Sequence, residues 1–430
     1  MTKISLESKC PFAASERMRI VDVCAFYSPD GGGVRTYVEA KLQAAARFGH
    51  EMIVLAPGAD HSVVQRAPGG YLATIPSPRL PVDKRYRYFN DQQALHRALD
   101  EWRPDHVEAS SPWSSATMVG RWDGPATRSL VMHADPLSAY AYRWFGRIAP
   151  VATIDRWFDW FWKHLRGLDS LFDLIVCANH QFSGRLREQG LARVETLPMG
   201  VDPGLFSPGR RSPELRSDLL QGLGLDASAL LLVGIGRFAA EKRWDMVVRA
   251  VGEAGRSAPI GLVLAGDGPR RQRLQQLAER TAHVSILPRI ADRRELARLL
   301  ASADALVHGC EAETFCMAAA EARASGLPLI VPDRGAAVDQ LVPGAGAIYR
   351  SGRVQSLAEA ISTFAATGPE LQHARAVHHA RSRTMDEHFG ELFARYAQLH
   401  RGGAASLDSR TAHGAAVPPA AFGAPAGVAV

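Results

Sequence analysis

The chain has 430 residues, 47% of them hydrophobic, and its 50 lysines and arginines exceed 44 acids to give a formal charge of +6. This length predicts two or three domains with cores of their own, and so small and dispersed a charge gives no indication of nucleic-acid binding. Residues 1–16 lack a signal-peptide core, and no run of about 18 apolar residues indicates a membrane span. With five cysteines and no Cys-x-x-Cys, we expect a cytoplasmic protein with reduced thiols.

Two successive regions of the chain alternate apolar, strand-like runs with stretches of helical periodicity. The first region has a helix from Val34 and strands expected at 20–26, 52–55, 106–109, 129–132 and 174–177. The second begins after Asp202 and has strands expected at 230–234, 261–264, 284–287, 305–307 and 329–331. Such alternation predicts parallel sheets covered by helices. The fold class is therefore α/β, with two doubly wound, Rossmann-like domains facing across a cleft where ligands meet the carboxyl ends of strands.

Composition and the restart of the pattern set the segment boundaries. Residues 401–430 are rich in Gly, Ala, Ser and Pro without any period, and we expect them, like residues 1–16, to be disordered. The ordered divisions are expected to be a first domain at 17–203, a second at 204–375 and a closing segment at 376–400. The closing segment contains an expected helix from Met385 to Leu399, which we expect to pack back onto the first domain.

A glycine-rich loop, Gly31-Gly32-Gly33, follows the first expected strand. Glycines let backbone amides approach an anion closely. The spacing is not Gly-x-Gly-x-x-Gly, however, and the next strand ends in Ala56-Pro57-Gly58 without the acid that a nicotinamide ribose needs, which counts against a dehydrogenase. The loop is then either a tight turn or the border of a phosphate site. Arg35, just beyond it, points either to an acceptor or to solvent.

His133 follows the expected strand at 129–132, and Asp135 is the carboxylate nearest to it in sequence. A histidine at the carboxyl end of a strand is placed to reach a ligand in the cleft. A lone histidine in such a position is also typical of a satisfied structural residue. Asp135 is a candidate base for an acceptor hydroxyl. These residues alone leave both interpretations open.

An aromatic segment runs from Arg156 to Arg166. At about 100° per residue, one continuous helix would place on one side Trp157, Trp160, Phe161 and Leu165, and on the other Arg156, Asp159, Lys163 and Arg166. Such a helix suits an anionic membrane surface, where tryptophan is favoured and cations meet lipid headgroups. It equally suits packing on the core of the first domain. The basic and aromatic run at 79–89 is a second candidate surface for an acceptor.

Arg237 and Lys242 lie five residues apart across an expected strand-to-helix turn. Fixed cations there can converge on one diphosphate beside a helix N-terminus and stabilise the charge that develops as it leaves a sugar. No Asp-x-Asp motif or His/Cys cluster that would hold a metal is evident. The alternative is an ordinary surface pair on the helix.

Two glutamates, Glu313 and Glu321, stand eight positions apart. We expect a helix over 314–324, stopped by Gly326, with Glu313 at its mouth. Glu321 would then lie on nearly the same face, about 12 Å further along the axis. Such a pair can hold the vicinal hydroxyls of a ribose and the hydroxyls of a sugar. The alternative is two solvated helix acids.

Four motifs of the second half occur together in the order that one known family has them. They are Leu-Pro-Met-Gly-Val-Asp at 197–202, the run 231–238 with Glu241-Lys242, the run 262–269 ending in Gly-Asp-Gly-Pro, and Glu313-x7-Glu321. The chain thereby resembles the retaining nucleotide-sugar glycosyltransferases of family four, the group 1 glycosyltransferases of the two-domain B-type fold. The resemblance is strongest over 197–342.

This resemblance implies transfer of a hexose from a UDP- or GDP-sugar to a hydroxyl of a glycolipid, lipid or polysaccharide precursor, with retention and without metal or other cofactor. The first domain would bind the acceptor and the second the nucleotide sugar. The implied catalytic residues are His133, Arg237, Lys242 and Glu313. The implied donor-binding residues are Gly32, Gly33, Gly236, Arg237, Lys242, Gly266, Arg289, Ile290, Glu313, Phe315, Cys316, Met317 and Glu321. The implied acceptor contacts are Arg35 and Asp135.

Three departures from the family pattern bear on the donor more than on activity. Cys316 stands where glycine is frequent, Met199 where asparagine is frequent, and residues 335–339 replace a Gly-Gly pair followed by glutamate. We expect the cysteine to be tolerated because it would lie in helical backbone. Competing functions are a nucleotide-sugar 2-epimerase and a non-catalytic sugar- or lipid-binding relative. The intact Arg237, Lys242 and glutamates favour transfer, by an enzyme that is either wholly cytoplasmic or peripheral on the cytoplasmic face of a membrane.

Overall fold

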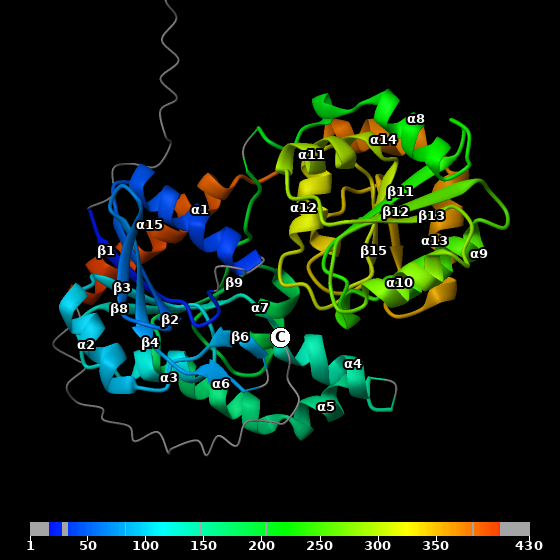
Figure 1. Cartoon of the computed structure of the whole chain (residues 1–430). Coiled ribbons are helices and arrows are strands. Elements are labelled where there is room, and N and C mark those ends of the chain that lie inside the picture. The colour runs from blue at the N-terminus through cyan, green and yellow to red at the C-terminus, as the bar shows by residue number, and fades with distance from the viewer. Residues whose placement is uncertain are drawn as a thin grey trace, which may run out of the picture.

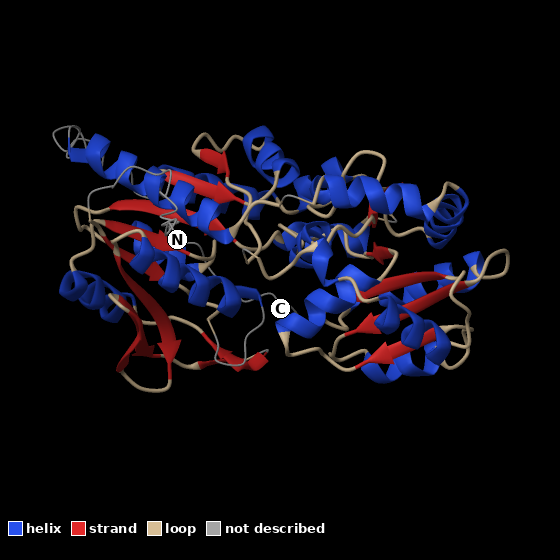
Figure 2. Ribbon diagram, turned by 90° about the horizontal axis from the view of Figure 1, so that it is seen from above, coloured by secondary structure: helices blue, strands red, loops and turns tan. Residues whose placement is uncertain are grey.

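The computed structural model describes residues 17–27, 33–81, 83–146, 148–202, 204–380 and 382–404. In these residues the chain forms two halves, each built on a sheet of mainly parallel strands with helices on both faces (Figures 1 and 2). The expected α/β class with two doubly wound sheets is confirmed.

The first half contains an eight-stranded sheet in the order β10-β9-β8-β7-β1-β2-β4-β3. Its strands are β1 (Arg19–Val23), β2 (Glu51–Gly58), β3 (Ser62–Ala67), β4 (Gly70–Pro76), β7 (His106–Ala109), β8 (Thr127–Met132), β9 (Leu174–Cys177) and β10 (Val194–Thr196). All neighbours are parallel except β3, which runs antiparallel to β4. The helices are α1 (Gly33–Arg47), α2 (Gln92–Trp102), α3 (Ser114–Gly120), η1 (Leu137–Ala141), α4 (Tyr142–Phe145), α5 (Val151–Trp157), α6 (Asp159–Leu171) and α7 (His180–Glu188).

The second half contains a six-stranded parallel sheet in the order β13-β12-β11-β14-β15-β16. Its strands are β11 (Leu230–Ile235), β12 (Ile260–Ala265), β13 (Val284–Leu287), β14 (Ala305–Val307), β15 (Leu329–Pro332) and β16 (Gly346–Tyr349). The helices are η2 (Pro208–Arg210), α8 (Pro213–Gly222), η3 (Ala240–Lys242), α9 (Trp244–Ala254), α10 (Arg271–Ala278), α11 (Arg293–Ser302), α12 (Met317–Ala324), η4 (Val338–Gln340), α13 (Val354–Ala366) and α14 (Pro369–His378).

All the expected strands except the edge strand β13 lie in the interior of a sheet. The strand at 260–265, for example, is buried at every position, and a parallel strand between two helical layers reads as a continuous apolar run. The sequence did not predict β3, β4, β10, β16 or the small antiparallel hairpin of β5 (Arg79–Leu80) and β6 (Asp83–Arg87). The edge strand β3 shows why, since it is exposed at five of its six positions and carries no buried run.

The aromatic segment folds as two helices, and the single amphipathic helix expected over 156–166 is wrong. The break lies at Phe158, between α5 and α6. Trp157 at the end of α5 and Trp160 on α6 are 52% and 49% exposed, while Phe161 and Leu165, also on α6, belong to the core of the first half. The expected aromatic face is therefore divided between core and surface. In the described ranges no helix combines the length and apolarity of a membrane span.

The chain crosses between the halves twice, and its last helix returns to the first half. The crossings lie side by side, because the Val201 amide donates to the Arg383 carbonyl at 2.9 Å and the Met385 amide donates to the Val201 carbonyl at 3.0 Å. Helix α15 (Met385–Ala404) then runs beside α1 (Figure 1). Its Phe389 and Phe393 pack in one cluster with apolar residues of β1, α1 and β2.

A fully buried charge cluster fastens α1 to this sheet. Lys41 of α1 contacts Asp22 of β1 at 3.0 Å and also contacts Glu108 of β7. Ser110 Oγ lies within hydrogen-bond distance of both acids, at 2.7 and 3.1 Å, and Tyr396 of α15 donates to Glu108 at 2.7 Å. Burial on its own lowers the pKa of Lys41, but the two acids outweigh it and raise that pKa above its ordinary value.

Candidate functional site

The residues singled out in the sequence gather where strands of the two sheets end. His133 follows β8 of the first sheet. In the second sheet, Gly236, Gly266, Arg289 and His308 follow β11, β12, β13 and β14. Parallel strands present their carboxyl ends at one edge of a sheet, where ligands of such folds bind.

Hydrogen bonds join the two halves beside this edge. Thr314 Oγ1 donates to the carbonyl oxygen of His133 at 2.8 Å, and the Asn179 side chain donates to the Thr314 carbonyl at 2.7 Å. The Gly335 amide donates to Gln181 Oε1 at 2.7 Å. The loop that carries Glu313 is therefore held against the strand end that carries His133.

The turn after β11 brings two chain segments into close approach. Gly236 has a φ of 151°, and a Cβ at Gly266 would lie 2.0 Å from the Gly236 carbonyl oxygen, so residue 266 has to be glycine. Arg237 follows at once, pairs with Glu241 at 3.0 Å and stays 44% exposed. Lys242 ends the short helix η3 that comes next. The two predicted cations thus lie on one turn at the edge of the sheet.

Lys242 contacts Glu313 across the ends of β11 and β14, and both side chains are 20% exposed. His308 Nε2 lies 3.3 Å from the same oxygen of Glu313, Oε1. Burial alone would raise the pKa of Glu313, but Lys242 and His308 outweigh it and hold that pKa below its ordinary value. The pairing likewise overcomes burial at Lys242 and raises its pKa. Both groups are therefore charged at neutral pH.

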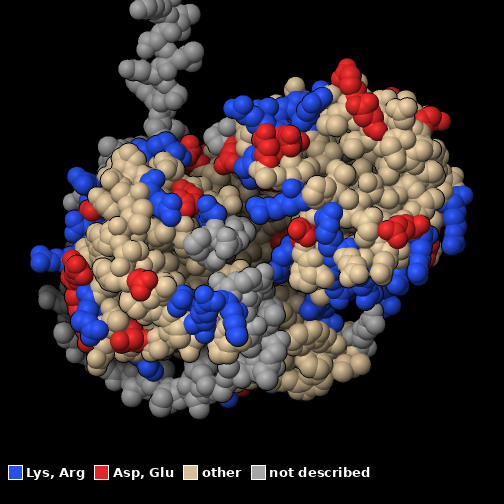
Figure 3. All heavy atoms as spheres, viewed as in Figure 1, with Lys and Arg blue, Asp and Glu red and all other residues tan. Residues whose placement is uncertain are grey.

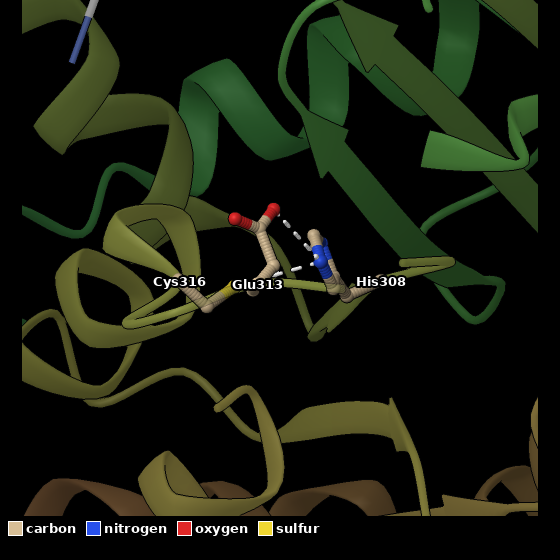
Figure 4. A group of neighbouring side chains, drawn as sticks. All are labelled: His308, Glu313 and Cys316. Atoms are coloured by element: carbon tan, nitrogen blue, oxygen red, sulfur yellow. Dashed lines mark hydrogen bonds and ion pairs between the residues drawn. The ribbon is translucent and has the colours of Figure 1, made fainter. Parts of the chain in front are cut away.

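His308, Glu313 and Cys316 form a cluster of potential metal ligands, which the sequence did not reveal (Figure 4). Their ligand atoms lie within 4.8 Å of one another, and His308 Nε2 lies 3.6 Å from Cys316 Sγ. Nitrogen, oxygen and sulfur donors of this kind suit Zn²⁺. The Oε1 that faces His308 also contacts the Lys242 ammonium, so a dication would have to displace the lysine. The expectation that no His/Cys cluster exists is therefore corrected. The positive charge beside this cluster is the ammonium group of Lys242.

Helix α12 begins at Met317, so the helix expected over 314–324 starts three residues too early. Cys316 precedes it in left-handed conformation, with φ 63° and ψ 70°. The expectation that this cysteine would lie in helical backbone is therefore wrong, and the position has the conformation that favours glycine. Glu313 consequently lies in a loop, and only Glu321 lies on the helix. The two glutamates reach the site from different elements and do not share one helix face.

Glu321 is the more buried of the two glutamates, with a side chain that is 7% exposed. Arg293 Nη2 donates to Glu321 Oε1 at 3.1 Å and to Asp202 Oδ2 at 2.8 Å. Burial raises the pKa of Glu321 to about 7, and Arg293 works against that rise. Glu313 is therefore ionised at all ordinary pH values, whereas Glu321 titrates near neutrality.

His133 reaches the edge of the first sheet without a charge. Its ring meets the Tyr37 ring edge to face, with centres 4.8 Å apart. Burial lowers the pKa of His133 to about 4, so the ring is neutral at physiological pH. Its Nε2 is buried and has no hydrogen-bond partner among the described residues. A buried polar atom without a partner is what a site for a polar ligand leaves before the ligand binds.

Gly32, Gly33 and Arg35 are the predicted residues around the start of α1 in the sequence. Gly33 begins α1, and no atom lies within 4 Å of where its Cβ would be, while Gly32 falls outside the described residues. Arg35 is exposed on the first turn of α1.

Asp135 forms its polar contacts with two residues of the first half, Ser138 and Arg185. It accepts a hydrogen bond from the Ser138 amide at 3.1 Å and forms an ion pair with Arg185. The Arg185 side chain is 17% exposed and that of Asp135 8%. These contacts fit a structural carboxylate better than a base for an acceptor.

The remaining donor candidates surround the two glutamates. Arg289 is exposed after β13, and Ile290 packs against the apolar cluster between the sheet and α12. Phe315 and Cys316 are buried in that cluster, with Met317 at its border. Phe315, Cys316 and Met317 thus anchor the chain between Glu313 and Glu321 to the core of the second half.

Two residues that contact the glutamates, His308 and Arg293, were not predicted from the sequence. His308 directly follows β14, so the rule that places ligand-facing residues at strand ends would have found it. Arg293 gave no such signal, because it lies on a different helix from Glu321 and 28 residues before it in the chain. Basic side chains also lie on both sides of the hollow between the halves on the face shown in Figure 3. Anionic ligands are favoured by such surroundings.

Two family models match successive parts of the chain. Residues 31–205 match the model described as Glycosyltransferase Family 4, and residues 217–381 match Glycosyl transferases group 1. The GDP-mannose-dependent alpha-(1-6)-phosphatidylinositol dimannoside mannosyltransferase of Mycobacterium tuberculosis is 30% identical over 356 residues, which cover 81% of this chain and 87% of the relative. The GDP-mannose-dependent alpha-mannosyltransferase of Corynebacterium glutamicum is 29% identical, with 76% of this chain and 75% of the relative covered.

Solved structures show the same fold at lower identity. Sucrose-phosphate synthase from Thermosynechococcus elongatus superposes with a TM-score of 0.68 at 18% identity, covering 90% of this chain and 100% of that structure. WaaG, a glycosyltransferase involved in lipopolysaccharide biosynthesis, superposes with a TM-score of 0.62 at 16% identity, covering 89% and 100%. The arrangement of two sheets with facing strand ends is thus common to these proteins and to this chain.

Proposed function

The chain belongs to the group 1 glycosyltransferases, and we propose that it transfers mannose from GDP-mannose to a hydroxyl of a glycolipid acceptor, with retention and without a divalent metal. Mannose and guanosine are supported by the relatives named above, whose names specify GDP-mannose. The glycolipid acceptor is supported by the relative that acts on a phosphatidylinositol dimannoside.

The observation that carries the proposal is the Lys242–Glu313 contact beside Arg237. As the bond from the sugar to the diphosphate breaks, negative charge develops on the leaving phosphate. Lys242 and Arg237, on one turn at the edge of the second sheet, would stabilise that charge and make a divalent metal unnecessary. Glu313 keeps Lys242 charged and in place, and is itself available to hydroxyls of the sugar.

Retention is proposed to follow from substitution on one face of the sugar. The acceptor oxygen forms its bond to the anomeric carbon on the face from which the diphosphate departs, and the acceptor proton passes to the leaving phosphate oxygen. Asp135 is held by Arg185 and Ser138, so it is a poor covalent nucleophile. Neutral His133 would contact the sugar through its unpartnered Nε2.

The product and the metal requirement test this proposal together. The enzyme is incubated with GDP-mannose and a mannosylated glycolipid, with UDP-glucose as a control donor, and the product linkage is measured by NMR coupling constants. We expect an α-linked mannoside and equal rates with and without EDTA. A β-linked product would overturn retention, and loss of activity on chelation that magnesium or manganese restores would overturn metal independence.

We also propose that exposed aromatic residues near α4, α5 and α6 meet an anionic membrane that contains the acceptor. The large apolar side chains at this surface are Trp144, Ile148, Val151, Trp157 and Trp160, with exposures from 37% to 76%. In Figure 1, α4 and α5 lie below the second half of the molecule. Tryptophan favours membrane interfaces, and this position would bring a lipid headgroup near the strand ends.

Vesicle sedimentation with a matched control tests the membrane contact. Trp157→Ala with Trp160→Ala should reduce binding to phosphatidylglycerol vesicles and leave the melting temperature nearly unchanged, because both side chains are half exposed. Val63→Ala with Val64→Ala, which alters similarly exposed residues on β3, should leave vesicle binding unchanged. A much lower melting temperature with unchanged vesicle binding would instead assign the tryptophans to packing.

A further inference from the structure

Arg293 connects the buried Glu321 carboxylate to the segment that crosses between the halves. It is the first residue of α11. Its Nη2 lies 3.1 Å from Glu321 Oε1 and 2.8 Å from Asp202 Oδ2, and its guanidinium carbon lies 5.2 Å from the centre of the Phe206 ring. Asp202 directly follows Val201, which pairs with Thr384 of the second crossing. Contacts from separate elements therefore fix the orientation of this arginine.

The arrangement matters because Glu321 sits where a charge is unfavourable. Its side chain is 7% exposed, against 40% for Asp202. Burial favours the neutral acid, Arg293 favours the carboxylate, and Asp202 disfavours it. Arg293 is thus the counter-charge that the buried carboxylate requires. Without it, Glu321 would take up a proton more readily.

The ionised form is the one that suits a ribose. A carboxylate has two acceptor oxygens and can receive one hydrogen bond from each of two vicinal hydroxyls, whereas the protonated acid loses acceptor capacity. The described contact of Arg293 runs from one guanidinium nitrogen, Nη2, to Oε1, so the arginine favours the charged carboxylate and directs one of its two oxygens. Charge and orientation at Glu321 are therefore set together.

We propose that Arg293 is a positioning residue for the nucleoside of the donor: it holds the Glu321 carboxylate toward the ribose hydroxyls and anchors it to Asp202 of the crossing segment. The inference rests on the proposed function, because Glu321 has to be the carboxylate that receives the ribose. Arg293 acts through Glu321 and need not touch the nucleotide itself.

A pair of nucleotides that differ only in the ribose hydroxyls tests this role. Binding of GDP and of 2′,3′-dideoxy-GDP is measured by calorimetry for the wild type, Arg293→Gln and Arg294→Gln. Arg294 is the exposed neighbour on the same turn, so its variant loses the same charge without losing the contact. We expect Arg293→Gln to weaken GDP at least about tenfold, as the loss of a charged hydrogen bond does, and to leave dideoxy-GDP within about twofold. Arg294→Gln should leave both unchanged.

A pH series supplies a readout that a merely structural role would not move. The charged groups that face Glu321 are Arg293 of α11 and Asp202 of the crossing segment. GDP affinity of the wild type should rise as the pH rises through about 7, where Glu321 loses its proton. Arg293→Gln should move this midpoint upward, because it removes the charge that favours the carboxylate. The phosphates of GDP titrate equally in both proteins, so the difference belongs to Glu321.

Equal weakening of GDP and dideoxy-GDP by Arg293→Gln, or no weakening of either, would overturn the inference. If Arg293→Gln does not fold, Arg293→Lys keeps the charge without the planar fork, and it should still weaken GDP more than dideoxy-GDP. A wild type that transfers mannose yet binds both nucleotides equally would overturn the role of Glu321, and with it that of Arg293. A wild type that discriminates the nucleotides but transfers no sugar would overturn the proposed function alone.

Discussion

Each half of the molecule holds a lysine against carboxylates, and the two clusters are built differently. In the first half, Lys41 lies between Asp22 and Glu108, and all three side chains are sealed from solvent. In the second half, Lys242 meets Glu313 at the edge of the sheet, and both side chains are 20% exposed. One cluster lies beneath the covering helices, and the other lies where the halves face each other.

The clusters also differ in how completely their carboxylates are used. Lys41, Ser110 and Tyr396 together engage all four carboxylate oxygens of the first cluster. In the described part of the chain, the contacts of Glu313 are both made to Oε1. A complete buried cluster has nothing left to bind and stabilises the fold, whereas an incomplete one at the surface retains an oxygen for a ligand. The fraction of carboxylate oxygens that have partners, more than burial alone, distinguishes the structural cluster at Lys41 from the cluster at Lys242.

Removing the first lysine should give the largest effect on stability. Lys41→Met leaves Asp22 and Glu108 facing each other without their buried counter-charge, and such losses cost about 3–5 kcal/mol. Urea unfolding followed by tryptophan fluorescence measures this. The control is Lys163→Met, because Lys163 is 72% exposed on α6 and pairs weakly with Asp159. An unchanged unfolding midpoint for Lys41→Met would contradict a structural role for the cluster.

Removing the second lysine should act mainly on the reaction. Lys242→Met should lower kcat by about 10²–10³-fold, the effect of deleting one group that stabilises developing charge. Its free energy of unfolding should change far less than that of Lys41→Met, since Glu313 keeps His308 and access to water. Initial rates with GDP-mannose measure the loss of kcat, and urea unfolding measures the change in stability. If both lysine variants lose stability alike, the distinction between the clusters fails.

Replacing each of the two glutamates of the second half should also affect different measured quantities. Glu321→Gln should weaken free GDP and raise the donor KM, whereas Glu313→Gln should leave GDP affinity near wild type and lower kcat. Each effect should exceed about tenfold, since a charged hydrogen bond contributes about 1.5–3 kcal/mol. Calorimetry with GDP and initial rates measure them. Equal weakening of GDP by both variants, or by neither, would contradict separate sugar and ribose partners.

The smallest expected effect is a gain in stability at Cys316. Cys316→Gly should stabilise the protein by about 1 kcal/mol, because relief of the left-handed backbone exceeds the unfolded-state entropy that glycine adds. Cys310→Gly is the control, since Cys310 is also buried but is not among the described residues with positive φ. Thermal unfolding should therefore shift in opposite directions for the two variants. A lower melting temperature for Cys316→Gly would show that its packing in the core outweighs the strain.

Four of the expected strands could be predicted from the sequence to the residue. The strands expected at 106–109, 174–177, 284–287 and 305–307 coincide with β7, β9, β13 and β14. Most of their side chains are apolar, so a short apolar run marks the strand, even at the edge position of β13. Edge strands such as β3 and the three-residue β10 lack that mark, because solvent or a loop replaces one covering layer.

The site was predictable only where a motif carries it. Arg237, Lys242 and the two glutamates were found because their spacing is a family pattern. The left-handed turn at Cys316 was not, since its neighbours all suit a helix and only the packed loop imposes that φ. Arg293 was missed because its role depends on how α11 and α12 lie beside each other. Local sequence sets the elements, while contacts between distant elements set the site.

The return of α15 to the first half has a consequence for how the chain is made. Phe389, Phe393 and Tyr396 complete a core whose other members include residues of β1, α1, β2, β8 and β9, and Tyr396 donates to Glu108. A ribosome delivers these residues only after the entire second half has emerged. Domains generally fold as they are synthesised. The second half can therefore fold before α15 is available to cover the apolar face of the first half. In this protein the half that is translated first is the half that is finished last.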